Sequence, residues 1–122
     1  MAFKGIRKNP SAPQVDAKIL AALRDIPVAA LSDNMHRNIG SVGLQPYHRP
    51  GAATMAGTAV TMKSRGGDNF TLLRAFEFCR PGDVIVIDAD GDLSNAVIGG
   101  ILSFYAATIG TVGVVLDGAI RD

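Results

Sequence analysis

The sequence is poor in cysteine and in glutamate, and both shortages limit the kind of protein that it can encode. Its single cysteine, Cys79, excludes an internal disulfide. Cys79 stands in an apolar stretch beside Phe76 and Phe78, which predicts a buried structural thiol rather than a nucleophile. A lone free thiol is typical of a reducing compartment, so we expect a cytoplasmic protein. All acidic residues except Glu77 are aspartates, and several stand at turns, where short carboxylates cap helices and bind ions.

Strong net charge is absent as well. The 122 residues carry a formal net charge of +1, and their lysines and arginines are scattered without a basic block. Bulk attraction to a polyanion is therefore excluded, and we expect no nucleic-acid partner. Residues 1–15 lack the apolar segment of a secretory signal, and we expect them to form a flexible N-terminal arm. Residues 16–122 then form a single domain.

One long segment, residues 93–116, carries no charge but is too irregular for a membrane span. Gly99, Gly100, Gly110 and Gly113 interrupt it, and polar residues are distributed through it. The residue pattern also changes from helical to extended at Gly110. We therefore expect a helix and a strand, both buried on nearly all sides, and no membrane partner.

The periodicity of the chain predicts an α/β domain with a largely parallel sheet. A β-α-β-α-β order follows from apolar segments that are separated by turns at residues 66–67, 81–83 and 90–92. Two helices precede this order, and residues 40–57, rich in glycine and proline, are expected to form a loop. The predicted helices span residues 16–24, 28–37, 68–79 and 95–108, with Asp16 and Asp68 placed to cap the first and the third. The predicted strands span residues 58–62, 84–88 and 112–116, and the continuous apolar residues 84–88 predict a strand that is covered on both faces.

Two of the predicted strands end in acid-bearing turns, at residues 88–92 and 117–118. Ligands collect beyond the carboxyl ends of parallel strands, so we expect a site at this edge of the sheet. The Gly99-Gly100 pair lies between the two turns, inside the predicted helix, where each glycine costs about 1 kcal/mol relative to alanine. Either another segment packs closely against the pair, or its backbone N–H groups bind an anion near a helix start.

The Arg121-Asp122 pair also has two interpretations. An arbitrary Arg-Asp pair is usually a surface ion pair or a turn cap. In a binding site, the arginine holds a carboxylate with two hydrogen bonds while the aspartate binds a hard divalent cation.

Other chemistries find little support in the sequence. A Schiff-base aldolase needs a buried lysine, and Lys63, the one lysine that follows a predicted strand, borders a polar turn. His36 and His48 lack partners at metal-ligand spacing. No GxGxxG or Walker pattern indicates a nucleotide site.

Several blocks of the sequence resemble the RraA-like family, which contains the regulator of ribonuclease activity A and the 4-hydroxy-4-methyl-2-oxoglutarate aldolases. The resemblance covers residues 28–122 and rests on LSDNMHRNIG, AGTAVTM, RPGDVIVIDADGD, AVIGG and AATIGTVGVVLDGAIRD. The family fold that it implies is an α/β/β sandwich of the swivelling-domain type. Such folds assemble as a homotrimer or a dimer of trimers, with sites between subunits. We expect the chain to be a C-terminally truncated piece that continues beyond residue 122.

The resemblance implies a divalent-metal-dependent lyase that cleaves 4-hydroxy-2-oxo acids, such as 4-hydroxy-4-methyl-2-oxoglutarate, to pyruvate, with oxaloacetate decarboxylation as a further activity. Asp122 would bind Mg²⁺ or Mn²⁺, partly through waters, and Arg121 would hold the carboxylate and keto oxygen of the 2-oxo acid. The metal and the arginine would stabilise the pyruvate enolate without a covalent step. Four residues would bind the pyruvate carboxylate through backbone N–H groups: Gly99, Gly100, Ile101 and Leu102.

The sequence departs from the family pattern at Gly100, where the aldolases carry an aspartate or glutamate that manages a proton. Asp92, an acid of a neighbouring subunit or an acid beyond residue 122 would replace it, or the chain is a poor aldolase. Such acid–base help is worth about 10²- to 10⁴-fold in rate. A second hypothesis is a non-catalytic regulator that binds a ribonuclease or another protein partner. Some family members are named menaquinone methyltransferases, but no glycine-rich cofactor loop supports that activity here.

Overall fold

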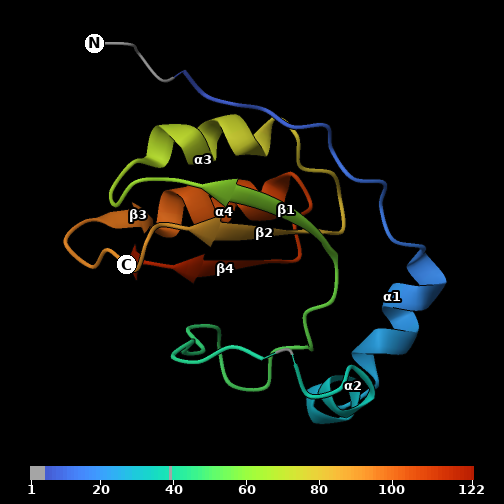
Figure 1. The fold of residues 1–122 in the computed structure, drawn as a ribbon. Helices are drawn as coiled ribbons and strands as arrows, with labels where there is room; N and C mark the ends of the chain where they lie inside the picture. Colours follow the sequence, from blue (N-terminus) through green and yellow to red (C-terminus); the bar gives the residue numbers. More distant parts are fainter. Residues whose placement is uncertain (1–4, 39) are drawn as a thin grey trace. The chain divides into compact units, whose positions relative to one another are not determined.

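The computed structural model describes residues 5–38 and 40–122, which form two compact units (Figure 1). One unit joins the N-terminal segment up to Gln14 to residues Thr58–Asp122, and the other unit is Val15–Gly57. In the described part of the chain, the strands all belong to the first unit, whereas the second contains helices and a long loop.

The Val15–Gly57 unit begins with two short helices, α1 (Ala17–Arg24) and α2 (Val28–Asn34). Asp16 caps α1 as predicted, because its carboxylate accepts a hydrogen bond of 2.7 Å from the backbone N–H two residues ahead. Residues 40–57 form neither helix nor strand, which confirms the predicted loop.

Helix α2 ends before Arg37, the residue to which the sequence extends it. His36 and Arg37 take positive φ angles of 59° and 57°, and a continued helix needs a negative φ at each residue. The Arg37 N–H donates to the Ser32 carbonyl at 2.9 Å, as in a Schellman-type helix end. The left-handed turn therefore stops the helix at Asn34.

The larger unit is built on three parallel strands, β1 (Thr58–Lys63), β2 (Asp83–Asp88) and β4 (Gly113–Asp117), in the order β1-β2-β4. Helix α3 (Asn69–Phe76) connects β1 to β2, and helix α4 (Gly100–Thr108) precedes β4. Both helices lie on the same face of the sheet (Figure 1), as expected for right-handed crossovers that advance in one direction. The predicted α/β class and parallel sheet are confirmed, and the predicted β-α-β-α-β order holds for the strands of this three-stranded sheet and their helices.

The core lies between this sheet and the two helices. Ile85 and Ile87 of β2 are buried and belong to one hydrophobic cluster with Leu72 of α3. The rings of Phe76 and Tyr105, one from each helix, meet edge to face with centroids 5.1 Å apart. Strand β2 is therefore buried, as its continuous apolar residues predict, and the structure places it at the centre of the sheet.

Residues 95–99, predicted as part of a helix, contain a strand instead, β3 (Ala96–Ile98). This strand pairs in parallel with β5 (Ala119–Ile120), which follows the predicted turn at residues 117–118 and for which the sequence predicts no strand. The β-branched pair Val97-Ile98 favours an extended conformation. Helix α4 therefore starts at Gly100, and the Gly99-Gly100 pair lies at its N-terminus rather than in its interior.

The uncharged segment is less buried than predicted. On α4, Ala106 is buried, but Ile101 and Phe104 are 85% and 74% exposed. Strand β4 is half-buried because it lies at the edge of the three-stranded sheet. Helix α3 is also shorter than predicted: its regular part ends at Phe76, and tighter i→i+3 hydrogen bonds continue to Cys79. Within residues 5–38 and 40–122, no helix is long and apolar enough to cross a membrane.

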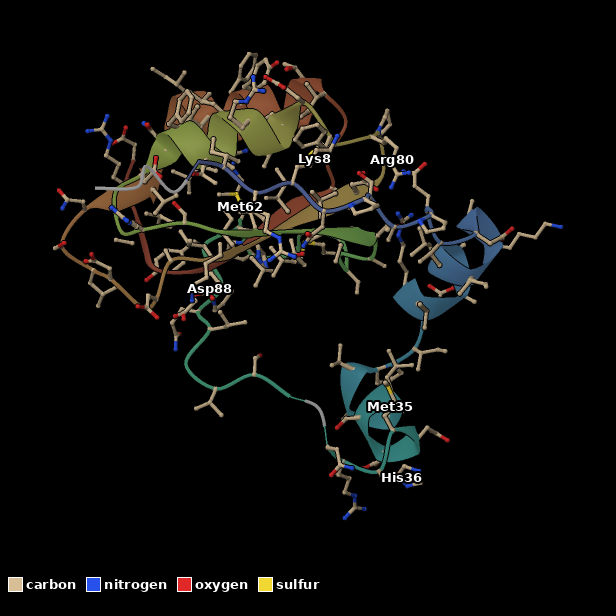
Figure 2. The ribbon with its side chains drawn as sticks, turned by 45° about the horizontal axis from the view of Figure 1, so that its top comes forward. Lys8, Met35, His36, Met62, Arg80 and Asp88 are labelled. Atoms are coloured by element: carbon tan, nitrogen blue, oxygen red, sulfur yellow. The ribbon has the colours of Figure 1, made fainter. Side chains whose placement is uncertain are left out.

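Within the larger unit, Lys8 and Gln14 of the N-terminal segment contact the residues that follow Thr58. The ammonium of Lys8, which is labelled in Figure 2, lies 3.7 Å from the centre of the Phe78 ring. The Gln14 amide donates a hydrogen bond of 3.0 Å to the carboxylate of Asp83, which is fully buried. The flexibility expected for residues 1–15 stays a prediction.

Candidate functional site

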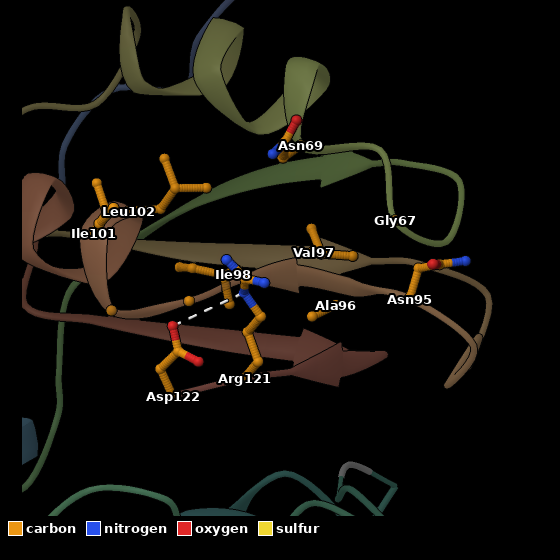
Figure 3. Close-up of a pocket in the computed structure, with 12 residues that line it drawn as sticks. Gly67, Asn69, Asn95, Ala96, Val97, Ile98, Ile101, Leu102, Arg121 and Asp122 are labelled. Carbon is orange, nitrogen blue, oxygen red and sulfur yellow. Dashed lines mark ion pairs between the residues drawn. The ribbon is translucent and has the colours of Figure 1, made fainter.

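A pocket of about 520 Å³ opens where β3 meets the N-termini of α3 and α4 and the end of β5 (Figure 3). Helix N-termini that follow parallel strands lie at the carboxyl ends of those strands, the expected position for a ligand. The lining includes all six residues that the resemblance assigns to the site: Gly99, Gly100, Ile101, Leu102, Arg121 and Asp122.

The N-terminus of α4 faces this pocket without a side-chain cap. Gly99 is the N-cap residue, and no side-chain hydrogen bond caps the helix. The first intrahelical bond runs from the Ser103 N–H to the Gly99 carbonyl, at 2.9 Å. The N–H groups of Gly100, Ile101 and Leu102 therefore precede the helical ladder, and helix amides in this position bind anions.

Pairing of β5 with β3 brings the Arg121-Asp122 pair to the same place. The Arg121 N–H donates to the Ile98 carbonyl at 3.1 Å, which continues the β3–β5 pairing past β5. A Cβ atom on Gly99 would stand 3.2 Å from Cγ of Arg121. Gly99 thus allows close packing against Arg121, and the Gly99-Gly100 pair also forms the start of a helix. Close packing and an anion-binding helix start are therefore compatible interpretations of this pair.

Arg121 and Asp122 are themselves a weak ion pair. Nε of Arg121 lies 3.8 Å from Oδ2 of Asp122, and the two side chains are 73% and 66% exposed. An ion pair this long and exposed stabilises a fold little. Most of the guanidinium donors and carboxylate lone pairs therefore remain available to a ligand in the pocket.

The donor set at this pocket suits a hard divalent cation held mostly by non-protein oxygens. Asp122 is the one carboxylate among the lining residues. The described part of the chain contains no group of three or more histidine, cysteine, aspartate or glutamate side chains that could hold a metal ion. Mg²⁺ commonly binds through one or two carboxylates, several waters and substrate oxygens, and Asp122 matches that pattern.

Sequence reasoning missed the opposite wall of the pocket, which contains Gly67, Asn69 and Asn95. Gly67 has a positive φ of 72°, and a Cβ there would lie 2.5 Å from Cβ of Asn95. Only glycine allows this approach. The sequence feature that could have indicated this wall is the Gly66-Gly67 pair, because two glycines before a helix cap indicate close packing as well as a turn.

The acid-bearing turns do not line the pocket. The Asp88 carboxylate accepts a 3.0 Å hydrogen bond from the Lys63 ammonium, which lowers the pKa of Asp88. The Asp92 carboxylate accepts hydrogen bonds from the hydroxyl and the N–H of Ser94, which lower the pKa of Asp92. Asp92 is thus engaged outside the pocket and is poorly placed to replace the family acid.

Two alternative nucleophiles have the wrong electrostatics. The neighbouring Asp88 carboxylate raises the pKa of Lys63, whereas a Schiff-base lysine needs a lowered pKa. Burial raises the pKa of Cys79, and its thiol donates to the Ala75 carbonyl at 3.4 Å. Cys79 therefore behaves as the structural thiol that the sequence predicts.

Comparison with known proteins places the chain in a family. The profile of the RraA-like family, described as Aldolase/RraA, matches residues 28–122. A Halalkalibacterium halodurans protein named "Putative 4-hydroxy-4-methyl-2-oxoglutarate aldolase" is 37% identical over 111 residues, which cover 89% of this chain and 51% of that protein. A Burkholderia multivorans protein of the same name is 41% identical over 81 residues, which cover 65% of this chain and 49% of that protein. The chain spans about half the length of these curated relatives.

A solved structure is similar as well. The crystal structure of S-adenosylmethionine: 2-dimethylmenaquinone methyltransferase from Geobacillus kaustophilus aligns with a TM-score of 0.64 and 30% identity. The alignment covers 80% of this chain and 60% of that one. The family profile extends over the complete β3–α4 segment and the Arg121-Asp122 pair that form the pocket. The chain therefore belongs to the RraA-like family.

Proposed function

We propose that the full-length protein is a divalent-metal-dependent lyase that cleaves 4-hydroxy-2-oxo acids, such as 4-hydroxy-4-methyl-2-oxoglutarate, to pyruvate. The observation that carries the proposal is the meeting of an uncapped helix N-terminus, Arg121 and Asp122 at one pocket. The names of the relatives from Halalkalibacterium halodurans and Burkholderia multivorans support the same reaction class.

Substrate binding follows from the charges of the pocket. The N–H groups at the start of α4 and the Arg121 guanidinium together attract the carboxylate of a 2-oxo acid. The guanidinium also reaches the adjacent keto oxygen, because its donors form a planar fork. This grip fixes C1 and C2 of the substrate and directs C3 and C4 toward the rest of the pocket.

Cleavage requires stabilisation of an enolate. When the C3–C4 bond breaks, its electron pair moves onto the 2-oxo acid fragment, the C4 hydroxyl loses a proton, and C4 becomes a carbonyl carbon. Asp122 would hold Mg²⁺ or Mn²⁺, which would supply Lewis-acid polarisation of the keto oxygen. Arg121 stabilises the developing negative charge, and protonation at C3 then yields pyruvate.

Proton transfer is the incomplete part of this site. Gly100 carries no acid, and Asp122 is the one carboxylate that lines the pocket. An acid from another subunit or from a further part of the protein would take the proton from the C4 hydroxyl. Decarboxylation of oxaloacetate forms the same enolate without removing a hydroxyl proton, so we expect it to depend less on that acid.

We further propose that the protein forms a homotrimer, or a dimer of trimers, with the pocket at a subunit boundary. Ile101 lines the pocket and is 85% exposed, and Phe104 on the same helix is 74% exposed. Large apolar side chains that gather at an exposed position are typical of protein–protein contacts. A neighbouring subunit at this surface would also exclude water from the pocket.

Gly100 supports a second candidate function, that of a non-catalytic regulator. Without a proton-managing acid the pocket can still bind a 2-oxo acid or a metal ion. The same scaffold would then act by binding a protein partner such as a ribonuclease.

Pyruvate release by the full-length protein separates the two candidates. We expect release from 4-hydroxy-4-methyl-2-oxoglutarate and from oxaloacetate with Mg²⁺, and loss of both activities with EDTA. Asp122→Asn should abolish the metal-dependent part, whereas Asp117→Asn, an exposed aspartate outside the pocket, should not. Absence of metal-dependent pyruvate from both substrates would overturn the lyase and favour the regulator.

A further inference from the structure

The loops that follow β1 and β2 pack closely against each other beside the pocket. A Cβ atom on Gly66 would overlap the carboxylate of Asp92, and a Cβ atom on Gly67 would stand 2.5 Å from Cβ of Asn95. Gly67 and Asn95 line the pocket, whereas Gly66 and Asp92 lie behind them (Figure 3). Two successive glycines therefore let the Asp92 loop support one wall of the pocket from outside.

A chain of hydrogen bonds runs from Asp92 to this wall. Oδ1 of Asp92 accepts from the Ser94 hydroxyl at 2.6 Å and from the Ser94 N–H at 2.7 Å, and these bonds lower the pKa of Asp92. An ionised carboxylate can only accept, so the Ser94 hydroxyl donates its proton to Asp92. The hydroxyl oxygen then accepts from Nδ2 of Asn95 at 3.1 Å. Asp92 thus orients the Asn95 amide, whose Oδ1 and second Nδ2 hydrogen can bind a ligand.

The Asp92 turn also contacts the segment that leads to the other wall. A Cβ atom on Gly118 would stand 2.9 Å from Cβ of Ala89 and 3.6 Å from the Asp92 carbonyl oxygen. Gly118 directly precedes β5, which leads to Arg121. One turn therefore touches both chain segments that enter the pocket, towards β3 and towards β5.

We propose that Asp92 is a positioning residue of the proposed lyase: through Ser94 it holds the Asn95 amide at the pocket wall, and that amide contacts the substrate beyond its 2-oxo acid group. The proposal rests on the proposed function, because it takes the 2-oxo acid group to bind at α4 and Arg121. An amide donates to a carboxylate and accepts from a hydroxyl, and 4-hydroxy-4-methyl-2-oxoglutarate carries both groups at C4.

The length of β3 fits this division of the substrate. Asn95 directly precedes Ala96–Ile98, and α4 begins after that strand. Three residues of strand span about 10 Å, at about 3.3 Å per residue. A five-carbon acid with a hydrogen bond of about 3 Å at each end covers a comparable distance, whereas three-carbon pyruvate contacts the α4 end alone.

Binding of uncleavable acids tests the role of Asp92 independently of turnover. 2-Oxoglutarate lacks the 4-hydroxyl group that cleavage needs. In calorimetric titrations of the full-length protein with Mg²⁺, we expect Ser94→Ala to bind 2-oxoglutarate about fivefold to tenfold more weakly and pyruvate almost unchanged. Ser94→Thr keeps the hydroxyl and should restore the binding of 2-oxoglutarate. Equal weakening for both acids would indicate a general structural effect and would overturn the proposal.

Two acids of the same turn provide a matched comparison. Asp92→Asn and Asp90→Asn each remove one negative charge, but Asp90 contacts only the Lys63 ammonium, at 4.0 Å, and does not line the pocket. We expect Asp92→Asn to weaken 2-oxoglutarate binding several-fold and Asp90→Asn to leave it unchanged. The same loss in both variants would be an effect of net charge and would contradict the positioning role.

A double-mutant cycle shows whether Asp92 acts through Asn95. Asn95→Ala removes the amide and should itself weaken 2-oxoglutarate binding about fivefold to tenfold. If Asp92 only positions that amide, Asp92→Asn should cause no further loss in the Asn95→Ala protein. Fully additive losses would show that Asp92 acts by another route and would overturn the proposal.

Turnover separates this proposal from the proposed function. For pyruvate release from 4-hydroxy-4-methyl-2-oxoglutarate, we expect Ser94→Ala to raise KM with little change in kcat, because the amide contacts the substrate and the transition state alike. If the unmodified protein releases no pyruvate, the proposed lyase fails, while the binding of the two uncleavable acids still decides the role of Asp92. If the unmodified protein binds neither acid, the positioning role fails as well.

Discussion

Gly100 lies next to Asp122 at the pocket: a Cβ atom on Gly100 would stand 3.9 Å from Cβ of Asp122, an ordinary contact, and would meet nothing closer. Gly100 is also the first residue of α4, where negative side chains are favourable to the helix. Position 100, which lacks the acidic residue of the family aldolases, therefore has room for an acidic side chain. That side chain would point toward Asp122, the residue to which metal binding is assigned.

Gly100→Asp should increase lyase activity. A carboxylate at this position can take the proton from the C4 hydroxyl through a bound water, and such help is worth about 10²- to 10⁴-fold in rate. We expect at least a tenfold higher kcat for 4-hydroxy-4-methyl-2-oxoglutarate, measured as pyruvate release, and a smaller gain for oxaloacetate. Gly100→Ala adds the Cβ without the acid and should change neither rate. An unchanged rate in Gly100→Asp would show that the acid comes from elsewhere.

Arg121→Lys should weaken catalysis without affecting the fold. The lysine keeps the charge but loses the planar fork that grips the carboxylate and the keto oxygen together. We expect kcat/KM to fall by about 10²-fold, as for other losses of a preorganised donor. The free energy of unfolding should hardly change, because the Arg121 side chain is 73% exposed. Arg65→Lys, outside the pocket, is the matched control.

Gly99→Ala tests whether close packing positions the arginine. The added Cβ would stand 3.2 Å from Cγ of Arg121, so the arginine must shift by a few tenths of an ångström. Alanine tolerates the backbone angles of Gly99, φ −141° and ψ −171°, so the fold should remain stable. We expect several-fold weaker binding of pyruvate by calorimetry. Gly100→Ala, with its nearest contact at 3.9 Å, should bind pyruvate normally.

The sequence predicts the helices and strands whose signals are local. Asp16 and Asp68 were expected to cap helices, and both do so through their carboxylates. Residues 84–88 were expected as a buried strand because the apolar residues are continuous, and β2 has this position. Each of these features depends on residues a few positions apart, which is the range that periodicity covers.

The missed features depend on distant partners. Strand β3 forms because Ala96–Ile98 pair with Ala119–Ile120, and a short apolar segment does not reveal such a partner. The same pairing brings Arg121 to the start of α4, which composition and spacing alone could not show. Asn69 and Asn95 were missed because a single asparagine has no pattern, and the close approach at Gly67 becomes visible only in three dimensions.

Ser94→Ala should change how stability depends on pH. Hydrogen bonds from Ser94 hold the pKa of Asp92 below its ordinary value of 3.8. A carboxylate with a lowered pKa in the folded state stabilises the protein above its unfolded pKa, and this contribution is lost as the pH falls through the folded pKa. We expect Ser94→Ala to raise the pKa of Asp92 in an NMR titration. Urea unfolding should show a loss of stability at neutral pH that disappears in acid, and an equal loss at both pH values would contradict this account.

Asp83→Ala should destabilise the larger unit, because it removes a buried carboxylate that accepts three hydrogen bonds. The Asp83 side chain is fully buried and accepts hydrogen bonds from the Arg80 backbone N–H at 2.8 Å, the Arg80 side chain at 3.3 Å and the Gln14 amide at 3.0 Å. The donors are partly buried, and loss of a hydrogen bond to a charged group costs about 1.5–3 kcal/mol, so thermal unfolding should begin at a clearly lower temperature. Glu77→Ala breaks the exposed pair with Arg74 and should change the free energy of unfolding by no more than about 0.5 kcal/mol. Similar losses of unfolding free energy in the two variants would mean that the buried carboxylate of Asp83 contributes no more to stability than a surface ion pair. They would also mean that the contact between Gln14 and β2 does not hold the N-terminal segment in place.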